Sequence, residues 1–87
     1  MEKIITYKSY TPENGFELTW EPNFEIKCET NGKVVKISAN TAGLISLANH
    51  LVALSQKNVP NGYHLHLDSS NSLEDDSCEL ILLKNDD

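Results

Sequence analysis

The 87-residue chain is acidic and contains no arginine: thirteen acidic residues outnumber seven lysines, and the formal net charge is −6. This length predicts a single domain over residues 1–87 with a small core. The negative charge disfavours nucleic acid and anionic membrane as partners. The absence of arginine removes the usual bidentate clamp for phosphate and carboxylate ligands. We therefore expect a partner with positive charge.

The start of the chain does not suggest export, and its apolar segments do not suggest membrane insertion. No window approaches the roughly 18 unbroken apolar residues of a membrane span, and the start, MEKIITYKSY, lacks the long apolar run of a secretory signal. We expect a cytoplasmic protein. Cys28 and Cys78 form no CxxC motif and each lies on the apolar phase of an alternating pattern, which favours two buried free thiols over a disulfide.

The first half of the chain predicts strands. A weak strand pattern covers residues 4–7, and Phe16–Trp20 alternates apolar and polar residues. A third alternation, Phe24–Cys28, is followed by Asn31-Gly32, which favours a type I′ hairpin turn. Counting back from this turn pairs Phe24 with Ala39, Ile26 with Ile37 and Cys28 with Val35 on the inner face, and Lys27 with Lys36 on the outer face.

One long helix is predicted over about residues 41–57, capped by Asn40 or Thr41. Gly43 in its first turn allows a close approach to the sheet. The helical spacing predicts that one apolar stripe faces the core, made of Leu44, Leu47, Ala48, Leu51 and Leu54.

Two further strands are predicted at residues 63–68 and 78–84, separated by the polar loop SSNSLEDD. The run Leu80–Leu83 is apolar on both phases, which predicts a central strand partly covered on both sides. The expected fold is α+β: a mostly antiparallel sheet of four to five strands with one long helix packed on one face.

His64, His66 and Asp68 recur at two-residue spacing, so a strand would project all three from one face. Two histidines at this spacing can share a metal, but a zinc site needs about four ligands and the sequence supplies no clear others. The polar face of an ordinary strand is therefore favoured, and no metal or cofactor is expected. A catalytic role is not indicated either, because Cys28 is on a buried phase and no nucleotide, zinc-protease or nucleophile motif is present.

Two acidic clusters are candidates for partner binding. The first recurs every four residues, and alternation places all four on the open side of two adjacent strands: Glu17, Glu21, Glu25 and Glu29. The second lies in the long loop and consists of Glu74, Asp75 and Asp76. Such carboxylates can simply keep the surface solvated. The second cluster favours the alternative, a docking surface for a basic protein.

Several stretches between Ala39 and Lys84 resemble the immunity protein 32 family, whose members are encoded beside toxins in bacterial polymorphic toxin systems. The resemblance rests on Ala39-Asn40, Gly43-Leu44, Leu47-Ala48, Leu51, Val59-Pro60, Gly62-Tyr63-His64, His66-Leu67-Asp68, Leu73-Glu74 and Glu79-Leu80-Ile81. It implies a non-enzymatic inhibitor that binds and blocks a cognate toxin domain.

Two other functions stay open at this point. One is a small metal- or ligand-binding module that uses His64, His66 and Asp68. The other is a structural subunit that self-associates through an exposed edge strand.

Overall fold

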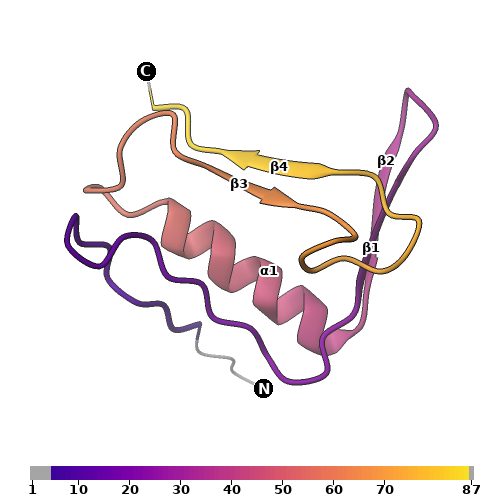
Figure 1. Ribbon diagram of the computed structural model, residues 1–87, viewed down its shortest axis with the longest axis horizontal. Coiled ribbons are helices and arrows are strands. Elements are labelled where there is room, and N and C mark those ends of the chain that lie inside the picture. Colours follow the sequence, from indigo (N-terminus) through magenta and orange to yellow (C-terminus); the bar gives the residue numbers. More distant parts are fainter. Residues whose placement is uncertain (1–4, 87) are drawn as a thin grey trace.

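The computed structural model describes residues 5–86, which form an α+β fold with one helix and two antiparallel two-stranded sheets (Figure 1). In chain order the elements are β1 (Ile26–Thr30), β2 (Val35–Ala39), α1 (Thr41–Leu54), β3 (His64–Leu67) and β4 (Leu80–Leu83). The predicted α+β class and the single long helix are confirmed. The predicted continuous sheet of four to five strands is not.

The β1–β2 hairpin turns where Asn31-Gly32 predicts, but its register differs from the prediction by two residues. Ile26 pairs with Ala39, and Cys28 pairs with Ile37. The difference arises because the side chain of Asn31 accepts hydrogen bonds from the amides of residues 33 and 34, at 3.0 and 2.9 Å, which lengthens the loop to four residues. A shift of two keeps every side chain on its predicted side of the strand. Val35 and Ile37 are nevertheless 63% and 41% exposed, so the inner face predicted for β2 is not buried.

The same shift changes the cross-strand pairs on the outer face of the hairpin from those predicted. Lys36 lies opposite Glu29 rather than Lys27, and its ammonium nitrogen is 3.4 Å from the Glu29 carboxylate. The predicted repulsion between two lysines is therefore replaced by an exposed ion pair, which contributes at most about 1 kcal/mol.

The loop between β3 and β4 runs along the free edge of β1. The amide of Glu74 donates to the carbonyl of Ile26, and the amide of Cys78 donates to the carbonyl of Cys28, both at 2.8 Å. The Cys28 amide donates to the Ser77 hydroxyl at 3.1 Å. These bonds connect the two sheets and satisfy the edge of β1 without making a continuous ladder.

The segment before β1 is extended but contains no strand between Phe16 and Trp20, so that prediction is wrong. Side chains of the helix and of the turn after it hold this segment in place. The Tyr10 amide donates to the Gln56 side chain at 2.9 Å, and the Asn58 side chain donates to the Tyr10 carbonyl at 2.7 Å. The Glu21 amide donates to the Ser46 hydroxyl of the helix at 2.8 Å, so side chains hold the chain on both sides of Phe16–Trp20. The weaker prediction at residues 4–7 begins outside the described residues, and residues 5–7 are not in a strand.

Asn40 caps the helix and ties it to the chain before β1. Its side-chain oxygen accepts from the amides of Gly43 at 2.8 Å and Glu25 at 3.0 Å, and its side-chain nitrogen donates to the carbonyl of Asn23 at 3.0 Å. A Cβ on Gly43 would collide with the carbonyl oxygen of Glu25 and approach the Ile26 side chain to 2.9 Å. The predicted cap and the predicted close approach at Gly43 are confirmed, although the helix ends at Leu54, three residues early.

The helix presents a different face to the core from the one its leucines predict. Its fully buried polar residues are Ser46, Asn49 and His50, whereas Leu44 and Leu51 are 55% and 52% exposed. The close approach at Gly43 determines the rotation, because residues three and seven positions later lie on the same side of a helix. The prediction that the whole leucine stripe faces the core is therefore wrong for Leu44 and Leu51, whereas Leu54 is buried and Leu47 packs against the core.

The core is small and lies where β1, the β3–β4 loop and β3 meet. Its main buried cluster is Ile26, Cys28, Leu67 and Leu73, and Ala53, Leu54 and Val59 are also buried. Trp20 and Phe24 pack against the main cluster, with stacked rings whose centroids are 4.4 Å apart. A core of this size supplies only a few kcal/mol net, so each buried side chain matters.

The outer face of β4 is not covered by any described element. Ile81 and Leu83 are 50% and 57% exposed, and within the described residues β4 pairs only with β3. The prediction that β4 is a central strand is wrong, and this face carries apolar side chains into solvent.

Candidate partner-binding surfaces

The first candidate surface forms where the β3–β4 loop lies against β1. Two adjoining shallow depressions share Lys27 and Glu74; Glu25 lines one of them, and Asp75 and Asp76 line the other. Glu29 projects from β1 on the same face as Glu25 and Lys27, because residues two apart share a strand face. We call Glu25, Glu29, Glu74, Asp75 and Asp76, with Lys27 among them, the acidic surface.

The structure thus joins half of the first predicted acidic cluster to the whole of the second. The hydrogen bond from the Glu74 amide to the Ile26 carbonyl brings the loop beside β1, which the sequence separates by almost fifty residues. Five carboxylates and two lysines, Lys27 and the Glu29 partner Lys36, leave this region with a charge of −3. A concentration of one sign of charge raises the rate of encounter with an oppositely charged protein.

Glu17 and Glu21 do not lie on a strand and are not part of the acidic surface. Both lie in the irregular segment before β1, so the predicted four-glutamate row on two adjacent strands is wrong. The Glu17 carboxylate is 4.0 Å from the Lys8 ammonium nitrogen. Glu21 is half-buried, and its amide donates to the Ser46 hydroxyl at 2.8 Å.

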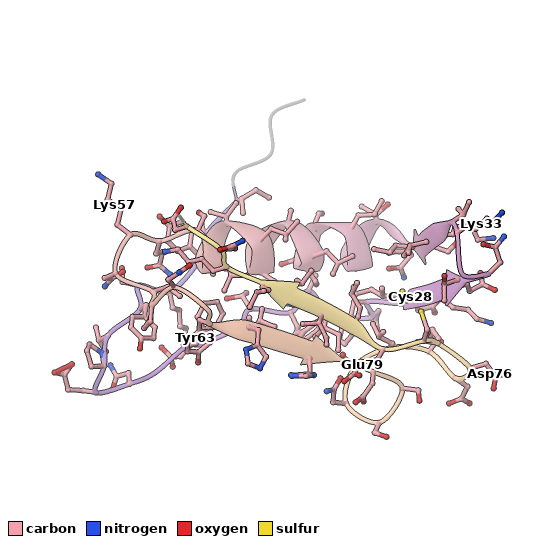
Figure 2. All side chains as sticks on the ribbon, turned by 90° about the horizontal axis from the view of Figure 1, so that it is seen from above. Cys28, Lys33, Lys57, Tyr63, Asp76 and Glu79 are labelled. Atoms are coloured by element: carbon pink, nitrogen blue, oxygen red, sulfur yellow. The ribbon has the colours of Figure 1, made fainter. Side chains whose placement is uncertain are left out.

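The second candidate surface is the outer face of β3 and β4. His64 lies opposite Leu83 and His66 lies opposite Ile81. Each exposed histidine of β3 is therefore paired with an exposed apolar side chain of β4. The imidazole rings are edge to face with centroids 4.9 Å apart, and Nδ1 of His66 is 2.9 Å from the Glu79 carboxylate. We call His64, His66, Glu79, Ile81 and Leu83 the histidine face; Figure 2 shows Glu79 at its edge.

Asp68 does not join the histidines. Its carboxylate oxygen accepts hydrogen bonds from the amides of Ser70 at 2.9 Å and Asn71 at 3.1 Å, which closes the turn after β3. Glu79, which lies just before β4, instead pairs with His66. Among residues 5–86 no three His, Cys, Asp or Glu side chains are grouped so that they could hold a metal ion.

His50 is a buried residue whose environment the sequence did not indicate. It is fully buried, the Trp20 ring meets it edge-on at a centroid distance of 4.2 Å, and neither ring nitrogen has a hydrogen-bond partner in the described structure. Burial lowers the pKa of this imidazole from 6.5 to about 4. His50 is therefore neutral near pH 7, and it contributes to packing rather than to a surface.

The two cysteines meet across the connection between the sheets. Both thiols are free, as predicted, with Cys28 buried and Cys78 half-buried, and their sulfur atoms are 3.1 Å apart. Burial, reinforced by the neighbouring Cys78, raises the pKa of Cys28 to about 11. A thiol of this kind stays protonated at neutral pH and is a poor nucleophile.

The fold and these surfaces define a small α+β domain whose distinctive features are an acidic surface and exposed apolar side chains. The chain belongs to the immunity protein 32 family, whose sequence model matches residues 34–85. This confirms the resemblance that the sequence showed between Ala39 and Lys84. No curated protein and no solved structure matches the chain.

The matched region includes β2, α1, β3 and β4, and therefore the loop acids Glu74, Asp75 and Asp76 and the whole histidine face. Glu25 and Glu29 precede it. Over residues 5–86, the helix is too short to qualify as a membrane-crossing segment.

Proposed function

We propose that this chain is a toxin-neutralising immunity protein, which binds a cognate toxin domain and blocks it without chemistry of its own. Membership of the immunity protein 32 family carries the proposal. Two free thiols suit a reducing compartment, so the proposed place of action is the cytoplasm. The expected partner is one toxin protein, and no cofactor or metal takes part.

We further propose that the acidic surface is the docking site and that the toxin is basic. The surface combines carboxylates from β1 and from the β3–β4 loop at one place, in a chain whose net charge is already −6. A toxin that acts on nucleic acid would itself need a positive surface to attract phosphate. Complementary charge of this kind speeds association more than it strengthens the final complex.

The inhibition itself is tested with the toxin encoded beside this chain. Stoichiometric amounts of the purified protein should abolish the toxin's activity, and mass spectrometry of the separated toxin should show an unmodified chain. Recovery of a cleaved or modified toxin would contradict a purely binding mechanism, and full toxin activity in a saturating excess would contradict the proposed function.

The docking site is tested by charge reversal at matched positions. Glu25→Lys with Glu74→Lys changes the net charge by four within the acidic surface, whereas Glu13→Lys with Glu17→Lys makes the same change in the segment before β1. We expect the first pair to slow association by about 10-fold at low salt, and the second pair to have a much smaller effect. Surface plasmon resonance at two salt concentrations measures the on-rates, with circular dichroism to verify folding.

Equal effects of the two pairs would show that net charge alone matters and would remove the acidic surface as a specific site. The histidine face would then be the next surface to mutate, because it is exposed and lies within the matched family region.

A further inference from the structure

The outward face of α1 is an uncharged apolar stripe. The helix contains no aspartate, glutamate, lysine or arginine between Thr41 and Leu54. Leu44, Leu51 and Val52 are 55%, 52% and 36% exposed. Because α1 turns its polar side inward, side chains that normally form a helix's buried face are left in solvent.

The stripe is symmetric about its central small residue, Ala48. Apolar side chains stand three and four positions before it, at Ile45 and Leu44, and three and four positions after it, at Leu51 and Val52. Two exposed hydroxyl residues lie seven positions before and seven positions after Ala48: Thr41 and Ser55. The average spacing of 3.5 residues is that of helices that pack along a shared seam.

We propose that this stripe is the contact between two copies of the chain, packed with their α1 helices antiparallel across a two-fold axis at Ala48. Such an axis places residues at equal distances before and after Ala48 against each other. Leu44 of one copy then meets Val52 of the other, and Ile45 meets Leu51. A two-fold interface requires this self-complementarity, and the alanine at its centre permits the helix axes to approach closely.

The distribution of charge favours a second copy over a basic partner at this stripe. Each copy carries a net charge of −6, so two copies repel one another except where a surface has no charge. Figure 2 shows α1 along one side of the molecule and the labelled Asp76 and Glu79 on the other, so these two carboxylates lie away from the contact. Asp86 lies at the C-terminal end of the stripe, in one depression with Leu51 and Lys84. The helix itself offers a basic protein no carboxylate.

The size of the stripe predicts a weak dimer. The fourteen residues of the helix span about 21 Å. One helix of this length offers a smaller contact area than the roughly 800 Å² per partner of a standard interface. Val35 and Ile37 of β2, which lies along the same side of the molecule in Figure 2, extend the apolar area. We expect dissociation in the range of roughly 10–100 µM.

Sedimentation of the full-length chain between about 1 µM and about 1 mM tests the proposal, since a dimer's population depends on concentration. The wild type should shift from monomer to dimer over this range. Leu44→Glu should weaken the dimer by at least about 10-fold, because it places an unpaired carboxylate in the contact. Leu83→Glu, on the histidine face, is the matched control and should leave dimerisation unchanged.

Charge rescue tests the antiparallel arrangement itself. Val52→Lys should also weaken the dimer, and an equimolar mixture of the Leu44→Glu and Val52→Lys chains should restore it by pairing the two charges. These positions are eight residues apart, about 12 Å along one helix, so the rescue can only come from contact between chains.

A monomeric wild type at the highest concentration would overturn the proposal. So would dimerisation that survives Leu44→Glu, dissociation by Leu83→Glu instead, or failure of the mixture to recover. Circular dichroism should show native helix in every variant, because positions 44, 52 and 83 are exposed. The dimer is independent of toxin binding, so either can fail without the other.

Discussion

Acidification should destabilise this protein in part by protonating one buried residue, His50. The imidazole is fully buried against Trp20, and burial lowers its pKa from 6.5 to about 4. The unfolded chain therefore binds a proton more readily than the folded one. Stability from this residue is fully present above about pH 6.5 and is lost progressively as the pH falls toward 4. Each pH unit in that window is worth about 1.4 kcal/mol.

The free energy of unfolding should therefore fall by about 2 kcal/mol between pH 7.5 and pH 5 on account of His50, and by about 3 kcal/mol by pH 4. Urea titrations at pH 7.5 and pH 5 measure the change. Other titrating groups contribute as well, so the relevant quantity is the difference between the wild type and His50→Leu, which removes the proton site and keeps an apolar side chain. His50→Gln serves as a polar control that does not titrate.

At pH 7.5, His50→Leu should be neutral or stabilising, because neither ring nitrogen has a hydrogen-bond partner to lose. At pH 5 it should be more stable than the wild type by about 2 kcal/mol. Equal pH dependence of the wild type and both variants would refute the reasoning and would indicate that the ring is hydrated or hydrogen-bonded in solution.

Three further predictions concern residues at the contacts between elements of the fold. Gly43→Ala should lower the free energy of unfolding by about 2 kcal/mol or more in chemical denaturation, because its Cβ would collide with the Glu25 carbonyl. This loss should exceed the gain from alanine's better helix propensity. A stabilised variant would show that the helix can move away from Glu25. Asn40→Ala should lower stability by about 1–2 kcal/mol in the same assay, and Asn40→Ser by less, since serine can still cap the helix. Alkylation of Cys28 at pH 8, followed by mass spectrometry, should be about 100-fold slower in the folded chain than in urea; equal rates would contradict its burial.

The strands and the helix were predictable because their signals are local. The alternation after Phe24, the cap at Asn40 and the 3.6-residue period that follows depend on neighbours in the sequence, and the structure contains β1, α1, β3 and β4 within or close to the predicted ranges. The predicted hairpin register differs from the observed one by two residues. The reason is that the Asn31 side chain hydrogen-bonds to amides of its own loop, which favours a four-residue loop over a two-residue turn.

The acidic surface needed the tertiary structure. Its loop acids could be recognised as a cluster, but their place beside Glu25 depends on a hydrogen bond between Glu74 and Ile26, a contact that no local pattern encodes. Glu17 and Glu21 were grouped with them on an alternation that looks like a strand. Alternation records which side chains face the core. An extended segment held at its ends by side chains of the helix and of the turn after it shows the same alternation.

Family membership, the acidic charge and the α+β class were thus determined by the sequence alone, since each depends on residue identity and short-range order. The direction in which α1 faces was decided only in the folded molecule. Leucine spacing predicts which side of a helix is most apolar, but the contact between Gly43 and β1 rotates the polar side, with His50, into the core. A close backbone approach tolerates only hydrogen at that position, so this steric constraint prevails over hydrophobic periodicity, and Leu44 and Leu51 are left facing solvent.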